Sequence, residues 1–335
     1  MTGLIGLAEV NQVVERVAAK QSASAIKSVS DQSGRRLDGG RNALLCCTIA
    51  VSLLTLACAQ PAPREGDIAF PFAPPSGVTW RVTEHRVTTT IRAGQTTEQA
   101  VDSTGSLSIM ATAMSSTTME WTMLTSTSGG APTDPDATEG LVGSTIRFQT
   151  DAGGNPTRIE SVTLAQSSSV AGPTTGRISR GSLDRVLQGT DPETLTLMFL
   201  PQVAAISSCQ NFKFGPEHSL TRQGESPGIG AGSPITFDVV VVLESPGSAS
   251  KPARVRMTQS FDPVSAAASF SQAYQAAGRL PANGAGLSPM TRETVTNCEI
   301  DIATGTATRV SVETTVRMDD VELRETREIT LARTG

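Results

Sequence analysis

Histidine, aromatic side chains and charge are scarce in this chain. Its 335 residues include two histidines, and only 4% are aromatic and 18% charged. No stretch rich in Lys and Arg occurs and the formal net charge is −5, which argues against nucleic acid as a partner. Hydrophobic residues still make up 38% of the chain, which is enough for a core and argues against disorder.

Recognisable catalytic and cofactor motifs are also missing. There is no Gly-x-Ser-x-Gly elbow, no Cys-x-x-Cys pair and no His/Cys cluster with metal-ligand spacing. The glycine run at 228–232 lacks the ending of a phosphate loop, and a strand is expected after it instead of a helix. The acidic loop at 134–139 fails as a calcium loop, because Glu139 stands where glycine is required. The sequence therefore predicts no catalytic, cofactor-binding or metal-binding residue and no cofactor.

The two histidines are expected to be ordinary surface or hydrogen-bonded side chains. His85 falls in a strand-like segment and His218 near a loop. A catalytic pairing of residues distant in sequence stays open as an alternative, because triads are recognised by geometry and not by spacing.

An apolar run at 43–57 predicts export. It follows Arg35, Arg36 and Arg41, and a positive flank before about 15 apolar residues is typical of a secretory signal. A retained anchor is a third option beside the two processing routes below, but the run is short for a membrane span. All of these place the C-terminal part outside the cytoplasm, in the periplasm or anchored at the outer membrane.

Two processing sites overlap at the end of this run. Cleavage after Ala59 fits the small-x-small rule formed by Ala57 and Ala59. Cleavage after Ala57 fits the pattern of a bacterial lipobox and would place a lipid, and hence a membrane attachment, on Cys58. Both alternatives stay open.

The expected organisation is a single exported domain behind a leader. Residues 1–40 are predicted to be an unstructured or weakly helical leader, which a misassigned start codon would explain. Residues 41–59 are the signal peptide or lipoprotein signal, 60–76 a proline-rich linker, and 77–335 one β-rich domain.

Two cysteines remain outside the signal, Cys209 and Cys298. In an oxidising compartment they are expected to form a disulfide. They lie 89 residues apart, so on the chain-entropy model the bond would contribute ~4–5 kcal/mol.

Alternating apolar and polar residues predict many short strands. The segments are 78–82, 87–91, 107–113, 119–124, 146–150, 159–164, 235–243 and 255–261. Short helices are expected at 182–189, from 191 with a break at Pro201, and from Asp262-Pro263 to Gly278. The segment 223–234, rich in Gly, Pro and Ser, is expected to be a loop.

The C-terminal segments predict a specific hairpin register. A two-residue turn at 319–320 pairs Met318 with Val321 and places apolar residues of both strands on one face. Only Arg327, opposite Val312, does not fit that face. Most of the carboxylates at 313, 322, 325 and 328 are expected on the other, outer face. In the preceding strand, Cys298 is expected opposite Val312 and directed into the core.

The predicted fold class is mainly β: a curved antiparallel sheet, as a half-barrel or a two-sheet sandwich, with two or three short helices packed against it. This layout is similar in architecture to half-barrels that carry lipids or lipoproteins in bacterial envelopes. The sequence favours a non-enzymatic envelope protein that binds an apolar ligand, a lipid or an envelope protein. An extracytoplasmic hydrolase, or a structural or assembly factor without a ligand, is the alternative.

Overall fold

The computed structural model describes residues 67–113, 115–132, 142–163, 196, 199–226, 232–276, 290–318 and 321–334, all within the compact unit Ser52–Gly335. Several predicted features lie outside these residues. They are the leader 1–40, the signal 41–59 with Ala57, Cys58 and Ala59, the acidic loop 134–139, the predicted helix 182–189 and the turn 319–320.

The described residues form a mainly β fold built around one large antiparallel sheet. Its strand order is β7-β6-β4-β3-β2-β14-β13-β12-β11-β10-β9, with β5 paired to β4, and the sheet is not closed. The strands are β2 (Thr79–Arg92), β3 (Gln95–Thr112), β4 (Ser116–Ser128), β5 (Ala131–Pro132), β6 (Thr145–Asp151), β7 (Pro156–Thr163), β9 (Ser219–Ser226), β10 (Ile235–Ser245), β11 (Ala253–Phe261), β12 (Thr291–Asp301), β13 (Thr306–Met318) and β14 (Val321–Arg333). A small second sheet pairs β1 (Ile68–Ala69) with β8 (Lys213–Phe214).

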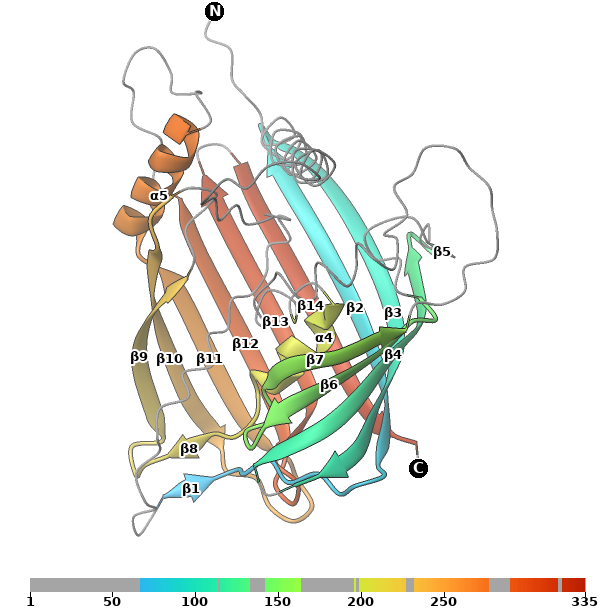
Figure 1. Cartoon of the computed structure of the whole chain (residues 1–335). Helices are drawn as coiled ribbons and strands as arrows, with labels where there is room; N and C mark the ends of the chain where they lie inside the picture. Colours follow the sequence, from blue (N-terminus) through green and yellow to red (C-terminus); the bar gives the residue numbers. More distant parts are fainter. Residues whose placement is uncertain are drawn as a thin grey trace, which may run out of the picture. The chain divides into compact units, whose positions relative to one another are not determined.

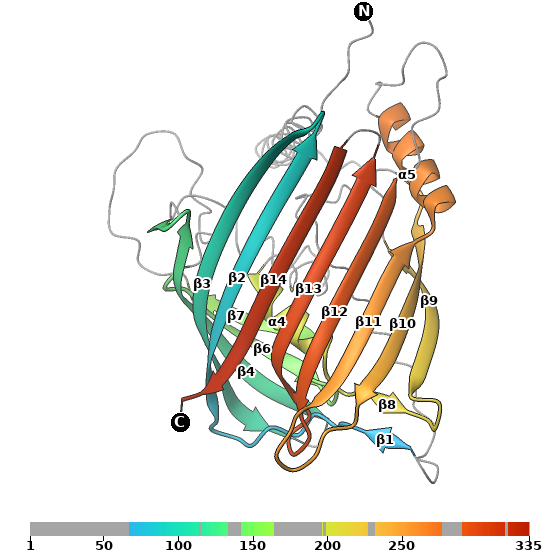
Figure 2. The ribbon, with the colours of Figure 1, turned by 180° about the vertical axis from the view of Figure 1, so that it is seen from behind.

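The large sheet curves along this order. In Figures 1 and 2, β4, β6 and β7 turn round toward the face that carries the helix α4 (Pro201–Ser207). We call this face of the sheet the inner face and the opposite one the outer face. Helix α4 packs against β13, and Val203 and Ile206 are buried there.

Alternation predicted most strands, but three segments need correction. The strand expected at 107–113 is the last part of β3, which begins at Gln95. The two short strands expected at 78–82 and 87–91 are one continuous strand, β2, which turns into β3 at Ala93 and Gly94. Both turn residues have positive φ, as a two-residue hairpin requires. The predicted loop over 223–234 is strand up to Ser226, because β9 completes its pairing with β10 there.

The register of the C-terminal hairpin is confirmed. Met318 pairs with Val321, and Arg327 lies opposite Val312. The preceding strand was predicted two residues out of register: Cys298 faces Val310 instead of Val312. A bulge at Glu299/Ile300 and a longer turn, in which the Asp301 carboxylate accepts hydrogen bonds from the next residues, account for the shift. The parity is unchanged, so Cys298 still points to the inner face.

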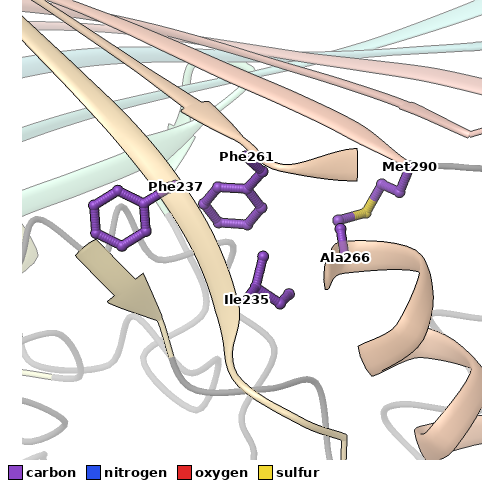
Figure 3. Packing of buried hydrophobic residues seen from close by; sticks show 5 residues of the cluster. All are labelled: Ile235, Phe237, Phe261, Ala266 and Met290. Carbon is purple, nitrogen blue, oxygen red and sulfur yellow. The ribbon is translucent and has the colours of Figure 1, made fainter. Parts of the chain in front are cut away.

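The helix that opens at Asp262-Pro263 is present as α5 (Pro263–Ala276). The Asp262 carboxylate caps it by accepting a hydrogen bond from the Ser265 N–H at 2.8 Å. Figure 3 shows the cluster that joins this helix to the sheet: Ile235, Phe237, Phe261, Ala266 and Met290. Pro201 stands at the first turn of α4, where proline is tolerated, so this helix begins there. Among the described helices, none is long and apolar enough to cross a membrane.

The second half of the predicted linker is part of the fold. Phe70 and Phe72 are buried, and the Phe70 N–H donates a hydrogen bond to the Phe212 carbonyl at 2.9 Å. Asp67 pairs with Lys213 at 3.3 Å. The proline count suggested an extended tether, but these two phenylalanines contribute apolar area that stabilises the segment against the domain.

Candidate functional site

The inner face of the sheet holds an ion pair that is almost completely buried. Glu84 on β2 and Arg327 on β14 are 7% exposed each. The Nε and Nη2 atoms of Arg327 both lie 2.7 Å from Glu84 Oε1. The second carboxylate oxygen accepts hydrogen bonds from Gln202 Nε2 of α4 at 2.8 Å and from Ser103 Oγ of β3 at 3.1 Å. Four elements therefore meet at one carboxylate.

This arrangement sets the protonation of Glu84. Burial by itself would raise the pKa of the carboxyl group, but Arg327, the hydrogen bond from Gln202 and the charge of Arg86 outweigh it, so the pKa is lowered from its usual value. Glu84 is therefore ionised at neutral pH, and both of its carboxylate oxygens accept hydrogen bonds from neighbouring side chains.

A row of polar side chains crosses the inner face next to this pair. Strand register aligns one residue from each of six neighbouring strands, β3, β2, β14, β13, β12 and β11. We call this set the polar row: Gln99, Thr88, Glu325, Thr314, Thr294 and Gln259. The row runs from an exposed end at Gln99 to residues that are 2–4% exposed at Thr294, Thr314 and Gln259.

The residues on either side of the polar row are both apolar and polar, and the apolar ones lie on both sides. Val312 and Met257 lie on the α4 side, and Leu323, Val316 and Phe261 lie on the other. Such a face can contact an apolar chain and hydrogen-bond a polar group at the same time.

One arginine stands within the apolar residues on the far side of the row. Arg292 of β12 lies opposite Val316, and its guanidinium is 5.0 Å from the centre of the Phe261 ring. Burial lowers the pKa of Arg292 to about 10, and the nearby charge of Glu325 opposes this shift. A cation over an aromatic ring in an apolar setting is stabilised by the ring and by any anion that reaches it.

The two faces of the central strands β2, β14, β13, β12 and β11 differ in charge. By alternation the inner face carries five arginines and two glutamates, and the outer face six arginines and six carboxylates. The inner set is Arg86, Arg92, Arg292, Arg327, Arg333, Glu84 and Glu325. The outer set is Arg81, Arg254, Arg256, Arg309, Arg317, Arg324, Glu293, Glu299, Asp301, Glu313, Glu322 and Glu328. On these five strands, arginines therefore outnumber carboxylates on the inner face and equal them in number on the outer face.

The predicted disulfide is present. Cys209, just after α4, is bonded to Cys298 of β12, and both are buried on the inner face. His85, by contrast, lies on the outer face with 53% of its side chain exposed, where Nδ1 is 2.7 Å from Asp102. His218 stands at the start of β9, and its carbonyl accepts a hydrogen bond from the Leu243 N–H. Within the described ranges, no group of three or more His, Cys, Asp or Glu could hold a metal.

Sequence reasoning missed the polar row and the partner of Arg327. The misfit of Arg327 in the predicted hairpin was the one local signal of a buried ion pair. Most of the four carboxylates that include Glu325 were expected on the outer face, and Glu325 is the exception, because it has the same parity as Val321 and Leu323 and points inward. Parity along β14 could have identified it.

No family model matches the chain, and no curated protein matches it significantly. Among solved structures, one of lipovitellin concerned with lipid–protein interactions aligns with 77% of this chain at 12% identity and a TM-score of 0.38. The alignment spans only 25% of the lipovitellin chain. A mutant of the Rh. blastica porin aligns with 76% of this chain and 99% of its own, at 9% identity and a TM-score of 0.29. An outer membrane channel from Pseudomonas putida F1 aligns with 82% of this chain and 100% of its own, at 9% identity and a TM-score of 0.15. At these TM-scores the likenesses carry no argument about function.

Proposed function

We propose that this chain is an exported envelope protein that binds an apolar or amphipathic ligand, such as a lipid, without chemical conversion. In this proposal the curved sheet acts as a half-barrel whose inner face receives the ligand. The observation that carries it is the polar row, which crosses six strands beside apolar residues such as Val312, Met257 and Val316 and ends at an exposed residue. A polar head group can hydrogen-bond to such a row beside the contacts that its members make with one another, as between Thr294 and Thr314 at 3.2 Å.

Export is supported by the disulfide and by the apolar run at 43–57. Disulfides persist in oxidising compartments, and Cys209–Cys298 ties α4 to the inner face. Signal cleavage after Ala59, or lipidation of Cys58 after cleavage at Ala57, remains a prediction. The intact mass of the mature protein distinguishes these routes. A mass that still includes residues 1–56 would contradict both.

The position of His85, the histidine within strand β2, favours a binding role over hydrolysis. His85 is paired with Asp102 on the outer face, whereas the buried carboxylate Glu84 is held by Arg327 and Gln202. Glu84 is thus engaged in structure and lies on the opposite face from His85.

The binding proposal is tested by native mass spectrometry of the mature protein purified from its host envelope. We expect a bound amphiphile on the wild-type protein. Val316→Trp, which fills space beside the polar row, should remove it, while Thr315→Trp on the outer face of the same strand should not. An unliganded wild-type protein that takes up no lipid from extracts, or equal retention in both folded variants, would overturn the proposal.

A further inference from the structure

The part of the inner face next to the β2–β3 turn suggests what kind of head group the ligand carries. We propose that the ligand is an amphiphile with an uncharged, hydroxyl-rich head group, such as a sugar, and that Thr88, Thr90 and Thr97 bind this head group. The inference rests on the proposed function and adds the chemical class of the ligand.

Exposure along the strands locates the binding region. On β2 the inner-face residues Val82 and Glu84 are buried, whereas Thr88 and Thr90 are partly exposed. On β3 the inner-face residues from 95 to 99 are all exposed. The inner face therefore opens toward the turn that joins β2 to β3, and we call this end of the strands the turn end.

The opposite end of the strands is covered by the segment that precedes β2. β1 and β8 lie at that end, whereas α5 lies at the turn end (Figures 1 and 2). The Phe70 N–H donates a hydrogen bond to the Phe212 carbonyl, and the Ala73 N–H donates one to the Thr304 carbonyl at 2.8 Å. In this proposal the ligand therefore approaches from the turn end.

The turn end of the inner face has a polar side on β2 and β3 and an apolar side on β13 and β14. The polar side consists of Thr88, Thr90, Arg92, Gln95, Thr97 and Gln99. The apolar side consists of Val316, Met318, Val321 and Leu323. The two sides meet at Thr90, which lies between Thr97 of β3 and Leu323 of β14. A molecule with one polar and one apolar end fits this boundary.

Contact with water alone does not account for the polar side. On the same stretches of β2 and β3, the outer face carries Val87, Thr89, Ile91, Thr96, Glu98 and Ala100. Three of these six residues are apolar, whereas none of the six residues of the polar side is. Hydroxyl and amide groups are thus concentrated on the face that receives the ligand in this proposal, and not on both faces alike.

The spacing of the hydroxyl groups suits a head group with several hydroxyls of its own. Thr88 and Thr90 are two residues apart on β2, which is ~7 Å along a strand, and Thr97 lies directly opposite Thr90. Threonine hydroxyls both donate and accept hydrogen bonds, as sugar hydroxyls do. Gln99 already lies 3.5 Å from Ser128 Oγ through its Nε2, so the assignment uses the threonines.

Charges of both signs border these threonines, which favours an uncharged head group. Glu325 lies opposite Thr88, so an anionic head group bound there would meet a carboxylate. Arg92 follows Thr90 on the same face, so a cationic head group would meet a guanidinium. A hydroxyl group can donate to the first and accept from the second.

The apolar side provides contacts for the alkyl chain. Val316 and Met318 pack against the cluster that joins α5 to the sheet, and both remain partly exposed. Leu323, opposite Val316, is also partly exposed. The alkyl chain is assigned to these three residues, because covering them removes apolar surface from water.

The test compares three dodecyl probes that differ in head group. Dodecyl maltoside, dodecanoate and dodecyl phosphocholine are titrated against the delipidated mature protein by calorimetry, each below its micelle concentration, and maltose is titrated as the free sugar. We expect the maltoside to bind about tenfold more tightly than the other two dodecyl probes, as one or two added hydrogen bonds would give. Maltose without the alkyl chain should show no binding at the same concentrations.

The run of three threonines on β2 supplies a matched pair of variants. Thr88→Val/Thr90→Val removes two inner-face hydroxyl groups with little change in shape. It should lower the affinity for the maltoside about tenfold and leave that for dodecanoate unchanged. Thr89→Val, which removes the outer-face hydroxyl group between them, should change neither affinity.

Several results would count against this inference. If dodecanoate or dodecyl phosphocholine binds as tightly as the maltoside, if maltose binds as tightly as the maltoside, or if the folded double variant keeps the preference, the inference is wrong while the proposed function stands. If no dodecyl probe binds and the protein carries no lipid, the proposed function fails as well. The probe series needs only wild-type protein, so it remains decisive even if a variant misfolds.

Discussion

The inner and outer faces of the same five strands use ionisable side chains in different ways. On the outer face the charges are balanced and exposed, as in Arg309 with Glu328, whose side chains are 56% and 42% exposed. On the inner face the side chains of Arg327 and Glu84 are 9% and 6% exposed, and Glu84 is also bonded to two further elements. The exposure of an ion pair to solvent, and not the number of such pairs, therefore decides how much each pair contributes to stability.

The difference follows from dielectric surroundings. An exposed pair is screened and gains little, whereas a buried pair interacts strongly but must first lose its hydration. A buried pair is therefore costly to break and poorly tolerates a shift in register, which would place Arg327 away from Glu84. Changes on the inner face should therefore have larger effects on stability than changes on the outer face.

The largest effect is expected from the covalent link between α4 and the inner face. The double variant Cys209→Ala/Cys298→Ala removes a cross-link over 89 residues and should lower the free energy of unfolding by ~4–5 kcal/mol on the chain-entropy model. Denaturant titration measures it, with reduced wild-type protein as the control. A loss well below 1 kcal/mol in both samples would show that the link adds nothing to the inner face.

Breaking the buried pair comes next. Glu84→Gln leaves Arg327 buried without its counter-charge and should cost ~3–5 kcal/mol of unfolding free energy. The double variant Glu84→Leu/Arg327→Met, which removes both charges, should recover a large part of this loss. If the single and double variants are equally destabilised, burial of an uncompensated charge is not the cause.

The carboxylate of Glu84 should also affect how the free energy of unfolding changes at acidic pH. The pKa of Glu84 is lowered in the folded protein, so its stabilising contribution is present above its unfolded value of 4.5 and is lost as the pH falls through the folded value. Glu84→Gln should therefore flatten the acid limb of stability against pH. Glu322→Gln is the outer-face comparison, because hydrogen bonds from Arg317 and Arg324 also lower the pKa of Glu322.

Much of the sheet could be predicted from the sequence because alternation is a local signal. Met318 and Val321 had to share a face, and the structure confirms it. Cys298 was assigned to the correct face but two residues out of register, since a bulge cannot be read from apolar parity. The part of strand β9 at Gln223–Ser226 was predicted to be a loop, because its Gly and Ser residues are typical of loops. Its pairing with β10 makes it a strand.

The candidate site could not be predicted from local sequence patterns, because its residues come together only in the folded sheet. Arg327 was identified as a misfit, yet its partner Glu84 lies 243 residues away in sequence. The polar row is harder still to predict, because Thr88, Thr294 and Thr314 are each ordinary strand residues. They become a row only through the registers of several hairpins together.

Close packing of the inner face gives a smaller prediction. A Cβ at Gly105 would overlap the ring of Trp121, although the backbone at Gly105 suits any residue. Gly105→Ala should therefore cost ~1–3 kcal/mol through overpacking. Ser106→Ala, the next residue on the outer face of β3, should change stability by less than about 0.5 kcal/mol. Equal effects in thermal unfolding would mean that the two faces do not differ in packing.

The smallest effect is expected for an outer-face ion pair. In Arg309–Glu328, Nη2 lies 3.1 Å from Oε2, the same kind of contact as in Arg327–Glu84. Because water and salt screen it, Glu328→Gln should change the unfolding free energy by only ~0–1 kcal/mol, and less at high salt. Denaturant titrations of this variant and of Glu84→Gln, each at low and high ionic strength, make the comparison direct. A salt-insensitive loss at Glu328 as large as that at Glu84 would mean that burial does not separate the two faces.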